Sequence, residues 1–167
     1  MQRYRKQQWL IINAVLLFAL FFIGYFVLGD VGHSGSTRVI DADTIVVDGK
    51  RFRLSGIDAP ESKQTCTLKK TGKIWPCGRK ATEALREKIK GEAVRCEGDN
   101  QDAYGRTLAV CYKGRENLNE WLVRNGWALA YTRYSNEYLS AQNKAENQGL
   151  GIWQSEFIKP EIWRRNN

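Results

Sequence analysis

Histidine is nearly absent from this sequence of 167 residues, and the only one, His33, lies in a short Gly- and Ser-containing stretch at residues 30–37. We expect no chemical role for it. A lone histidine in a linker excludes a Ser-His or Cys-His nucleophile pair, a histidine general base and a histidine-ligated metal site. If the chain is a hydrolase, carboxylates must therefore carry the proton chemistry.

Acidic residues are missing from the first 29 positions, and residues 9–28 are apolar apart from Asn13. About 20 apolar residues form a helix of ~30 Å, enough to cross a bilayer. Basic residues precede this segment, so the positive-inside rule predicts a cytoplasmic N-terminus at 1–8, a transmembrane anchor at 9–29 and a periplasmic or extracellular remainder. A cleaved signal peptide, which would give a secreted form, is the alternative. Its apolar region is usually shorter, ~7–15 residues, and no small-x-small cleavage site is obvious.

The sequence contains no Cys-x-x-Cys pair, which disfavours a zinc site. Its four cysteines all follow the predicted anchor, and an even count in an oxidising compartment predicts two disulfides. Of the three possible connectivities, we predict Cys66–Cys77, which closes one loop, and Cys96–Cys111, on neighbouring predicted strands.

Internal repeats and low-complexity tracts are also absent. About 130 residues follow the anchor, which is enough for one domain with its own core and too few for two. We place this domain at residues 38–158, between the linker at 30–37 and a C-terminal tail at 159–167, in which Ile162 and Trp163 should pack the chain end down and residues 164–167 should be solvated. Of the net charge of +8, +5 remains after residue 29. This excess favours an anionic partner, although lysine and arginine are also ordinary solubilising residues.

The Asp48-Gly49 dipeptide predicts a two-residue hairpin turn between two strands. In such a hairpin Thr44 pairs with Arg53, which places Asp43 beside Arg53 at the same end as Asp58. The apolar side chains that share the buried face of this hairpin are Ile45, Val47, Phe52 and Leu54.

The remaining periodic segments predict further helices and strands. Helices are expected at residues 78–90, 116–125 and 135–148, the last capped by Ser135, and strands at 92–97 and 106–112. This order is typical of a small α+β domain, mainly β, whose closed or partly closed antiparallel sheet carries helices on one side.

Charged residues gather at the end of the returning strand, in residues 51–62, RFRLSGIDAPES. Arg53, Asp58 and Glu61 lie within nine residues of one another in this stretch. Hard cations prefer carboxylate and carbonyl oxygens, and phosphates prefer arginine forks. The alternative is a solvated strand end that carries a surface ion pair.

Four motifs occur in order along the domain: DADT at 41–44, FRL at 52–54 with DAPE at 58–61, DAYGR at 102–106, and NEWLVRNG at 119–126. Together they resemble the staphylococcal nuclease-like (thermonuclease) family, over about residues 37–157. The resemblance implies an OB-fold five-stranded barrel with about three helices, which hydrolyses DNA and RNA phosphodiesters with Ca²⁺.

The resemblance also assigns roles to the acidic residues. Asp43 and Asp58 match metal-ligand carboxylates, and the Ala59 carbonyl matches a third ligand. The family often has threonine at this position, but a backbone ligand survives the change to alanine. Glu61 matches the general base on the attacking water, with ordering of water and metal as an alternative role. Asp41 is interpreted as supporting these ligands or forming the turn.

Arg53 and Arg106 match the pair of arginines that grip the phosphate. A phosphodiester passes through a more highly charged five-coordinate state, and each donor placed there contributes roughly 10²–10³ in rate. Tyr104, Tyr131 and Tyr134 are candidates to stack on a nucleobase, with packing inside the domain as the alternative for each.

The predicted function is therefore a Ca²⁺-dependent nuclease with low sequence specificity, which acts outside the cytoplasm on nucleic acid and is held to the membrane by its N-terminal helix. The first alternative is a non-catalytic nucleic-acid-binding OB-fold module tethered to the membrane. A membrane-tethered assembly protein is a further alternative that no feature favours. Because degenerate copies normally lose acids or arginines, the presence of all five charged site residues favours the enzyme.

Overall fold

The computed structural model describes residues 33–133 and 135–167, which belong to one compact unit, Gly32–Asn167. The predicted cytoplasmic N-terminus, the predicted transmembrane anchor and Tyr134 lie outside the described residues. Among the helices that are described, none combines the length and the apolar character needed to cross a membrane.

The predicted hairpin is confirmed residue by residue. Strands β3 (Thr44–Val47) and β4 (Lys50–Leu54) pair with Thr44 opposite Arg53. Asp48 and Gly49 both have positive φ angles, 49° and 78°, as the tight turn of a twisted hairpin requires. The four predicted apolar side chains, Ile45, Val47, Phe52 and Leu54, are fully buried.

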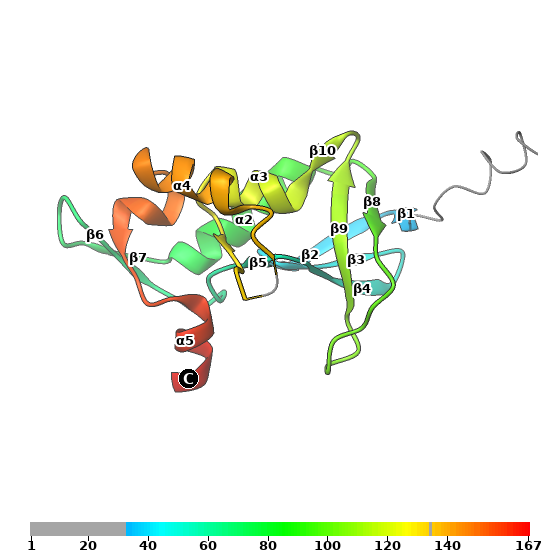
Figure 1. The fold of residues 1–167 in the computed structure, drawn as a ribbon, viewed down its shortest axis with the longest axis horizontal. Coiled ribbons are helices and arrows are strands. Elements are labelled where there is room, and N and C mark those ends of the chain that lie inside the picture. Colours follow the sequence, from blue (N-terminus) through cyan, green and yellow to red (C-terminus); the bar gives the residue numbers. More distant parts are fainter. Residues whose placement is uncertain (1–32, 134) are drawn as a thin grey trace, which may run out of the picture. The chain divides into compact units, whose positions relative to one another are not determined.

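The main sheet runs in the order β1-β8-β9-β4-β3-β2, and β10 (Glu116–Asn117) pairs with β9 (Figure 1). The strands not yet located are β1 (His33–Gly35), β2 (Thr37–Asp41), β8 (Val94–Glu97) and β9 (Thr107–Lys113). The β4–β9 pair is parallel, whereas the other pairs are antiparallel. The two ends of this order, β1 and β2, are consecutive in the chain, so the arrangement fits a closed, OB-like sheet.

Two smaller sheets extend this core. One pairs β5 (Ile57–Asp58) with β11 (Leu129–Ala130). The other runs β12-β6-β7, formed by Ser155–Glu156, Cys66–Leu68 and Ile74–Trp75. The β5–β11 pair matters for function, because it fixes the backbone of Asp58 at the end of the barrel.

The described residues contain four α-helices, so the prediction of about three was wrong by one at the C-terminus. They are α2 (Cys77–Ile89), α3 (Leu118–Arg124), α4 (Leu139–Asn147) and α5 (Pro160–Asn166), with a short 3-10 helix, η1 (Gly151–Gln154), between α4 and β12. Ser135 does not cap α4, which begins after Tyr138. The Ser135 hydroxyl instead accepts a hydrogen bond from the Glu137 backbone N–H.

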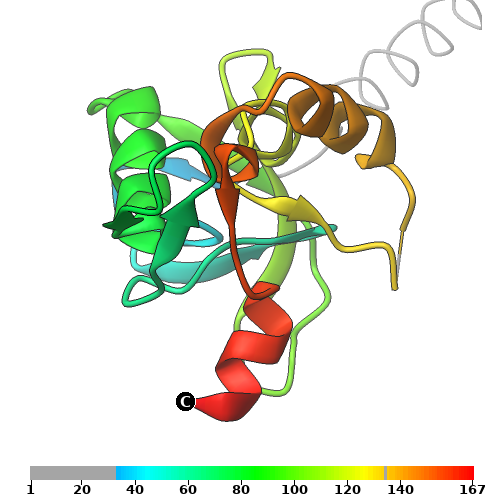
Figure 2. The same cartoon turned by 90° about the vertical axis from the view of Figure 1, so that its left-hand side faces the viewer.

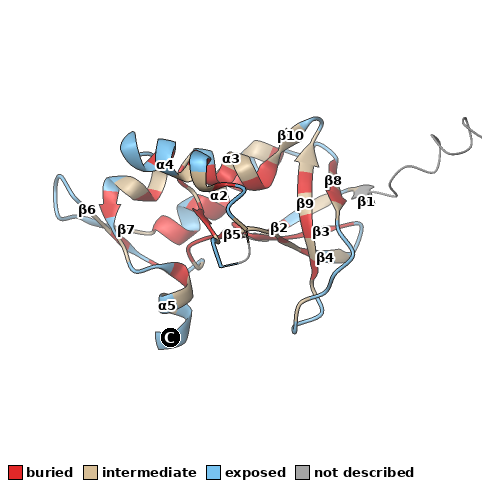
Figure 3. Cartoon of the chain, in the orientation of Figure 1, coloured by how far each residue is buried: buried red, intermediate tan, exposed pale blue. Residues whose placement is uncertain are grey.

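The core lies between the barrel and α2, α3 and α4. In Figure 3 the buried residues line the inner faces of these helices and the strands, whereas α5 is mostly exposed. Helix α2 buries one stripe of apolar side chains, Ala81, Leu85 and Ile89. Apolar burial of this kind stabilises the fold by about 25 cal/mol per Å².

The folded unit extends beyond the predicted limits of 38 and 158 at both ends. Residues 33–35, expected in the linker, form β1 and pair with β8. Residues 160–166, expected in the C-terminal tail, form α5. Both segments are short, so their sequences carry little periodicity, and their structure depends on contacts that are remote in the chain.

Both predicted disulfides, Cys66–Cys77 and Cys96–Cys111, are present. Cys96 and Cys111 are direct partners on β8 and β9. Replacing both with alanine should lower the free energy of unfolding by about 3 kcal/mol, because the bond restricts the unfolded chain over a sequence separation of 15. Urea denaturation measures this loss, and fully reduced wild-type protein, which lacks both disulfides, should be destabilised further. An unchanged denaturation midpoint in the variant would contradict the prediction.

Candidate active site

The centre of the site is an arginine between two buried aspartates. The Arg53 guanidinium lies 2.9 Å from Asp43 Oδ1 and 3.5 Å from Asp58 Oδ1. Both aspartate side chains are 6% exposed. Asp43 also accepts hydrogen bonds from the Thr44 hydroxyl and the Ala59 backbone N–H. The hairpin register and the β5 strand thus bring the predicted acids and Arg53 together.

Arg106 reaches the same cluster from the turn between β8 and β9. Its Nη1 donates to Thr44 Oγ1 at 3.4 Å, and that hydroxyl donates to Asp43. Asp102 holds the Arg106 guanidinium through contacts of 2.7 Å to Nε and 2.6 Å to Nη2. Partial burial acts to raise the pKa of Asp102, but the hydrogen bonds from Arg106 outweigh it and hold that pKa below its ordinary value.

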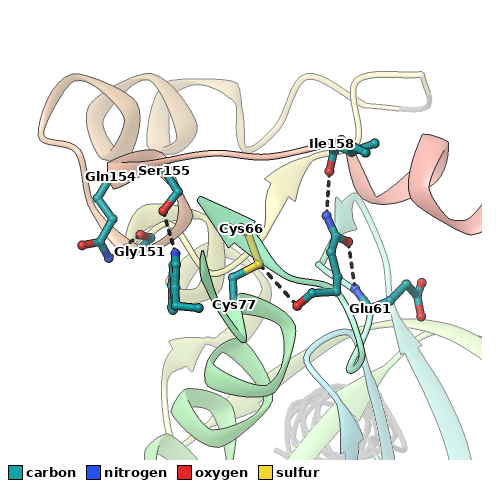
Figure 4. The surroundings of a disulfide bond; sticks show 9 residues. Glu61, Cys66, Cys77, Gly151, Gln154, Ser155 and Ile158 are labelled. Atoms are coloured by element: carbon teal, nitrogen blue, oxygen red, sulfur yellow. Dashed lines mark hydrogen bonds between the residues drawn. A yellow bond between two sulfur atoms is a disulfide. The ribbon is translucent and has the colours of Figure 1, made fainter. Parts of the chain in front are cut away.

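Glu61 lies on a turn that is fixed from three sides. Its backbone N–H donates to the side-chain oxygen of the fully buried Gln64, whose amide nitrogen donates to the Ile158 carbonyl at 2.6 Å. Figure 4 shows Glu61 and Ile158 on one side of the Cys66–Cys77 disulfide. Gly78, at the start of α2, packs so closely that an added Cβ would lie 1.7 Å from the Glu61 carbonyl oxygen.

Sequence reasoning missed one charged residue of the site, Arg164 on α5. Its Nη2 lies 2.6 Å from Asp58 Oδ1, and its Nη1 lies 2.7 Å from Glu61 Oε1. Arg164 lies in the segment predicted to be solvated and is partly exposed, but it also makes these two ion pairs. Partial burial acts to lower the pKa of Arg164, but its bonds to Glu61 and Asp58 outweigh this and raise that pKa, so the group stays charged.

Most of the predicted site residues line a cavity of about 820 Å³. The charged side chains that line it include Asp41, Asp43, Arg53, Glu61, Arg106 and Arg164. Figures 1 and 2 show α5 and the β8–β9 turn projecting on the same side of the domain, and residues of both line this cavity. Asp58 instead lines a neighbouring cavity of about 350 Å³.

Burial perturbs two of the acids. It is the main cause that raises the pKa of Asp41 to about 6, and the charge of Asp43 adds to it. Burial also raises the pKa of Asp58, an effect that the Arg164 guanidinium opposes. Asp41 forms the predicted turn, since its Oδ1 accepts a hydrogen bond from the Asp43 backbone.

The candidate stacking tyrosines differ in their surroundings. Tyr104 is 84% exposed, and the Arg106 guanidinium lies 5.4 Å from its ring centroid. Tyr131 is half-buried and lines both cavities. Tyr104 and Tyr131 therefore stand at the larger cavity, where a base could meet them, while Tyr134 falls outside the described residues.

The donors around Arg53 are of the type that hard cations prefer, namely carboxylate oxygens and nearby backbone groups. Within residues 33–133 and 135–167, no group of three or more acidic, histidine or cysteine side chains is assembled as a metal centre. Asp43 and Asp58 nevertheless already share one cation, the Arg53 guanidinium. The chemistry of this pair therefore fits a bound cation, and Ala59 lies against it through its N–H to Asp43.

The fold and the site together define a class of protein: small OB-like α+β domains that carry carboxylates and arginines at one end of the barrel. Residues 51–155 match the family described as "Staphylococcal nuclease homologue". The chain therefore belongs to the staphylococcal nuclease family.

Individual relatives agree with this assignment. A "Thermonuclease" of Staphylococcus hyicus is 37% identical over 127 residues, which cover 70% of this chain and 72% of that protein. An "Uncharacterized endonuclease" of Haemophilus influenzae is 35% identical over 136 residues, 77% of this chain and 70% of that protein. The "Succinoglycan biosynthesis protein ExoI" of Rhizobium meliloti is 36% identical over 125 residues, 73% of this chain and 65% of that protein, just under two thirds of its length.

Proposed function

We propose that the protein is a nuclease that hydrolyses phosphodiester bonds of DNA, RNA or both, with low sequence specificity and with Ca²⁺. One observation carries the proposal: carboxylates and two arginines of the predicted set meet around one cavity. Family membership and relatives named as nucleases and endonucleases support an enzyme that hydrolyses nucleic acid.

The side chains divide the chemistry between them. Water attacks phosphorus, its proton passes to Glu61 Oε2, and the bond from phosphorus to the leaving oxygen breaks, after which that oxygen takes up a proton from solvent. The Arg53 and Arg106 guanidiniums donate hydrogen bonds to the phosphate oxygens, whose negative charge grows in the five-coordinate state. Tyr104 and Tyr131 lie at the cavity wall, where a stacked base would position the strand without reading its sequence.

Asp43 and Asp58 would hold the cation, together with the Ala59 carbonyl. A bound Ca²⁺ supplies positive charge that stabilises the phosphorane-like state. The aspartates are nearly buried, so their negative charges attract a cation more strongly than exposed carboxylates would.

We also propose that the domain lies outside the cytoplasm, attached to the inner membrane or released by cleavage. Two disulfides support an oxidising compartment, and the basic residues followed by the apolar residues 9–29 support export. Protease treatment of intact cells or spheroplasts should digest the C-terminal domain. Its complete protection until lysis would contradict this location.

The full chain should cleave heat-denatured DNA in Ca²⁺, stop in a chelator and recover when excess Ca²⁺ is restored. Gel analysis of fragment length measures this. The Glu83→Gln variant, altered at an exposed carboxylate on α2, should remain active, whereas Glu61→Gln should not, which excludes a contaminating nuclease. Binding without cleavage would favour the binding-module alternative, and cleavage unaffected by the chelator would contradict Ca²⁺ dependence.

A further inference from the structure

Helix α5 places a third guanidinium beside the reacting groups. Arg164 donates to Glu61 Oε1 at 2.7 Å and to Asp58 Oδ1 at 2.6 Å. Its side chain is 34% exposed, compared with 6% for Asp58 and 30% for Glu61. The single planar fork thus joins a nearly buried aspartate to the more exposed glutamate that lines the cavity.

The helix that carries Arg164 is fastened to the same site at its first turn. The Glu161 backbone N–H donates to Asp58 Oδ2 at 3.0 Å. Pro160 is buried at the first helical position. Just before the helix, the Ile158 carbonyl accepts from Gln64, which also binds the backbone of Glu61. Arg164 therefore belongs to a segment that is tied both to strand β5, which carries Asp58, and to the turn that carries Glu61.

The ion pair with Arg164 uses only one of the two carboxylate oxygens of Glu61. Oε1 of Glu61 binds Arg164, and among the described residues no hydrogen bond is made to Oε2. A glutamate side chain has several rotamers, and fixing one of them costs conformational entropy. An arginine on one oxygen holds the carboxylate in place, and the other oxygen stays without a hydrogen bond among the described residues.

We propose that Arg164 is a positioning residue: it holds the Glu61 carboxylate in the orientation in which Oε2 receives the proton of the attacking water. This inference rests on the proposed nuclease function. It assigns a role in the reaction to the C-terminal helix, which lies outside the matched residues 51–155.

Two other roles for Arg164 give different kinetics. A direct ligand of the substrate phosphate would affect KM at least as much as kcat. A group that blocks the cation would, when removed, raise activity and tighten Ca²⁺ binding. A positioning residue for Glu61 affects kcat, because orientation is needed in the transition state more than in the bound complex.

The test compares Arg164→Ala with Arg165→Ala on the full chain, using an oligothymidylate substrate. Arg165 is adjacent on α5 and 66% exposed, and its side chain binds Glu161 instead. We expect kcat to fall roughly 10- to 100-fold in Arg164→Ala, with KM changed less than about threefold, and both constants near wild type in Arg165→Ala. An unchanged or raised kcat, or a rise in KM alone, would overturn the proposal. Tighter Ca²⁺ binding by calorimetry together with a raised kcat in Arg164→Ala would show that Arg164 blocks the cation instead.

A double-mutant cycle with Glu61→Gln tests whether Arg164 acts through Glu61. If it does, adding Arg164→Ala to Glu61→Gln should lower kcat less than about threefold further. Fully multiplicative losses would show an independent role. Arg164→Lys, whose ammonium lacks the planar fork, should give an intermediate kcat, and it replaces the alanine variant if that variant does not fold. An inactive wild-type protein would reject the proposed function itself, whereas active wild type with an insensitive Arg164 would reject only this inference.

Discussion

Replacing Glu61 with glutamine should lower kcat by about 10²- to 10⁴-fold, the usual contribution of a general base. Glutamine keeps nearly the same size and shape but cannot take up the proton of the attacking water. The backbone contacts that fix the turn, from Glu61 N–H to Gln64 and from Gln64 to Ile158, do not involve the Glu61 carboxylate. The turn should therefore stay in place when the chemistry fails.

Two measurements separate this loss from unfolding. Thermal unfolding should change little, because Glu61 is 30% exposed and its ion pair with Arg164 lies partly in solvent, where such pairs stabilise by roughly 0–1 kcal/mol. The Glu83→Gln variant, which also removes one carboxylate from an ion pair, should retain normal kcat. A Glu61→Gln variant with near-normal kcat would remove Glu61 from the role of base.

The parts of the site that are coded locally could be predicted. The Asp48-Gly49 turn fixes the hairpin register, and that register alone places Asp43 beside Arg53, as observed at 2.9 Å. Alternation along β4 likewise buries Phe52 while Arg53 turns toward the acids. The positions of side chains at the end of a tight hairpin can be predicted from the sequence, because few backbone geometries satisfy such a turn.

The contacts of α5 could not be predicted in the same way. Arg164 meets Glu61 and Asp58 across 103 and 106 positions, and no periodic pattern encodes which distant charge an arginine will find. The helix itself did leave a signal: Pro160 at its first position, Glu161 in its first turn, and basic residues in its last turn. That signal predicts a helix but gives no indication of where it docks.

The parallel pairing of β4 with β9 could be predicted only in part. Both strands were expected, but a parallel contact between distant strands depends on closure of the whole sheet. It brings Arg53 opposite Leu108, two residues from Arg106, and this explains how a remote turn delivers the second phosphate-binding arginine. From the sequence, only the family resemblance assigned Arg106 to the phosphate, because its distance from Arg53 along the chain gives no sign that the two meet.

Replacing Gly78 with alanine should both destabilise the protein and lower kcat. The added Cβ would lie 1.7 Å from the Glu61 carbonyl oxygen and 3.3 Å from the Pro60 carbonyl oxygen. These are backbone atoms, so no rotamer change can relieve the overlap, and the turn and α2 must separate by more than 1 Å. Overpacking of this kind costs about 1–3 kcal/mol, and a misplacement of about 1 Å near the reacting atoms costs up to ~10²-fold in rate.

The adjacent variant Arg79→Ala provides the control. Arg79 is 66% exposed on the same first turn of α2, and its side chain makes only a 3.8 Å ion pair with Glu83 among the described residues. Urea denaturation and kcat should be close to wild type in Arg79→Ala, while both fall in Gly78→Ala. In an isolated helix the glycine-to-alanine change would be stabilising by about 1 kcal/mol. A loss of stability in Gly78→Ala would therefore be due to the contact with the Glu61 turn and not to helix propensity. A more stable, fully active Gly78→Ala variant would show that the position of Glu61 does not depend on the packing of α2 against its turn.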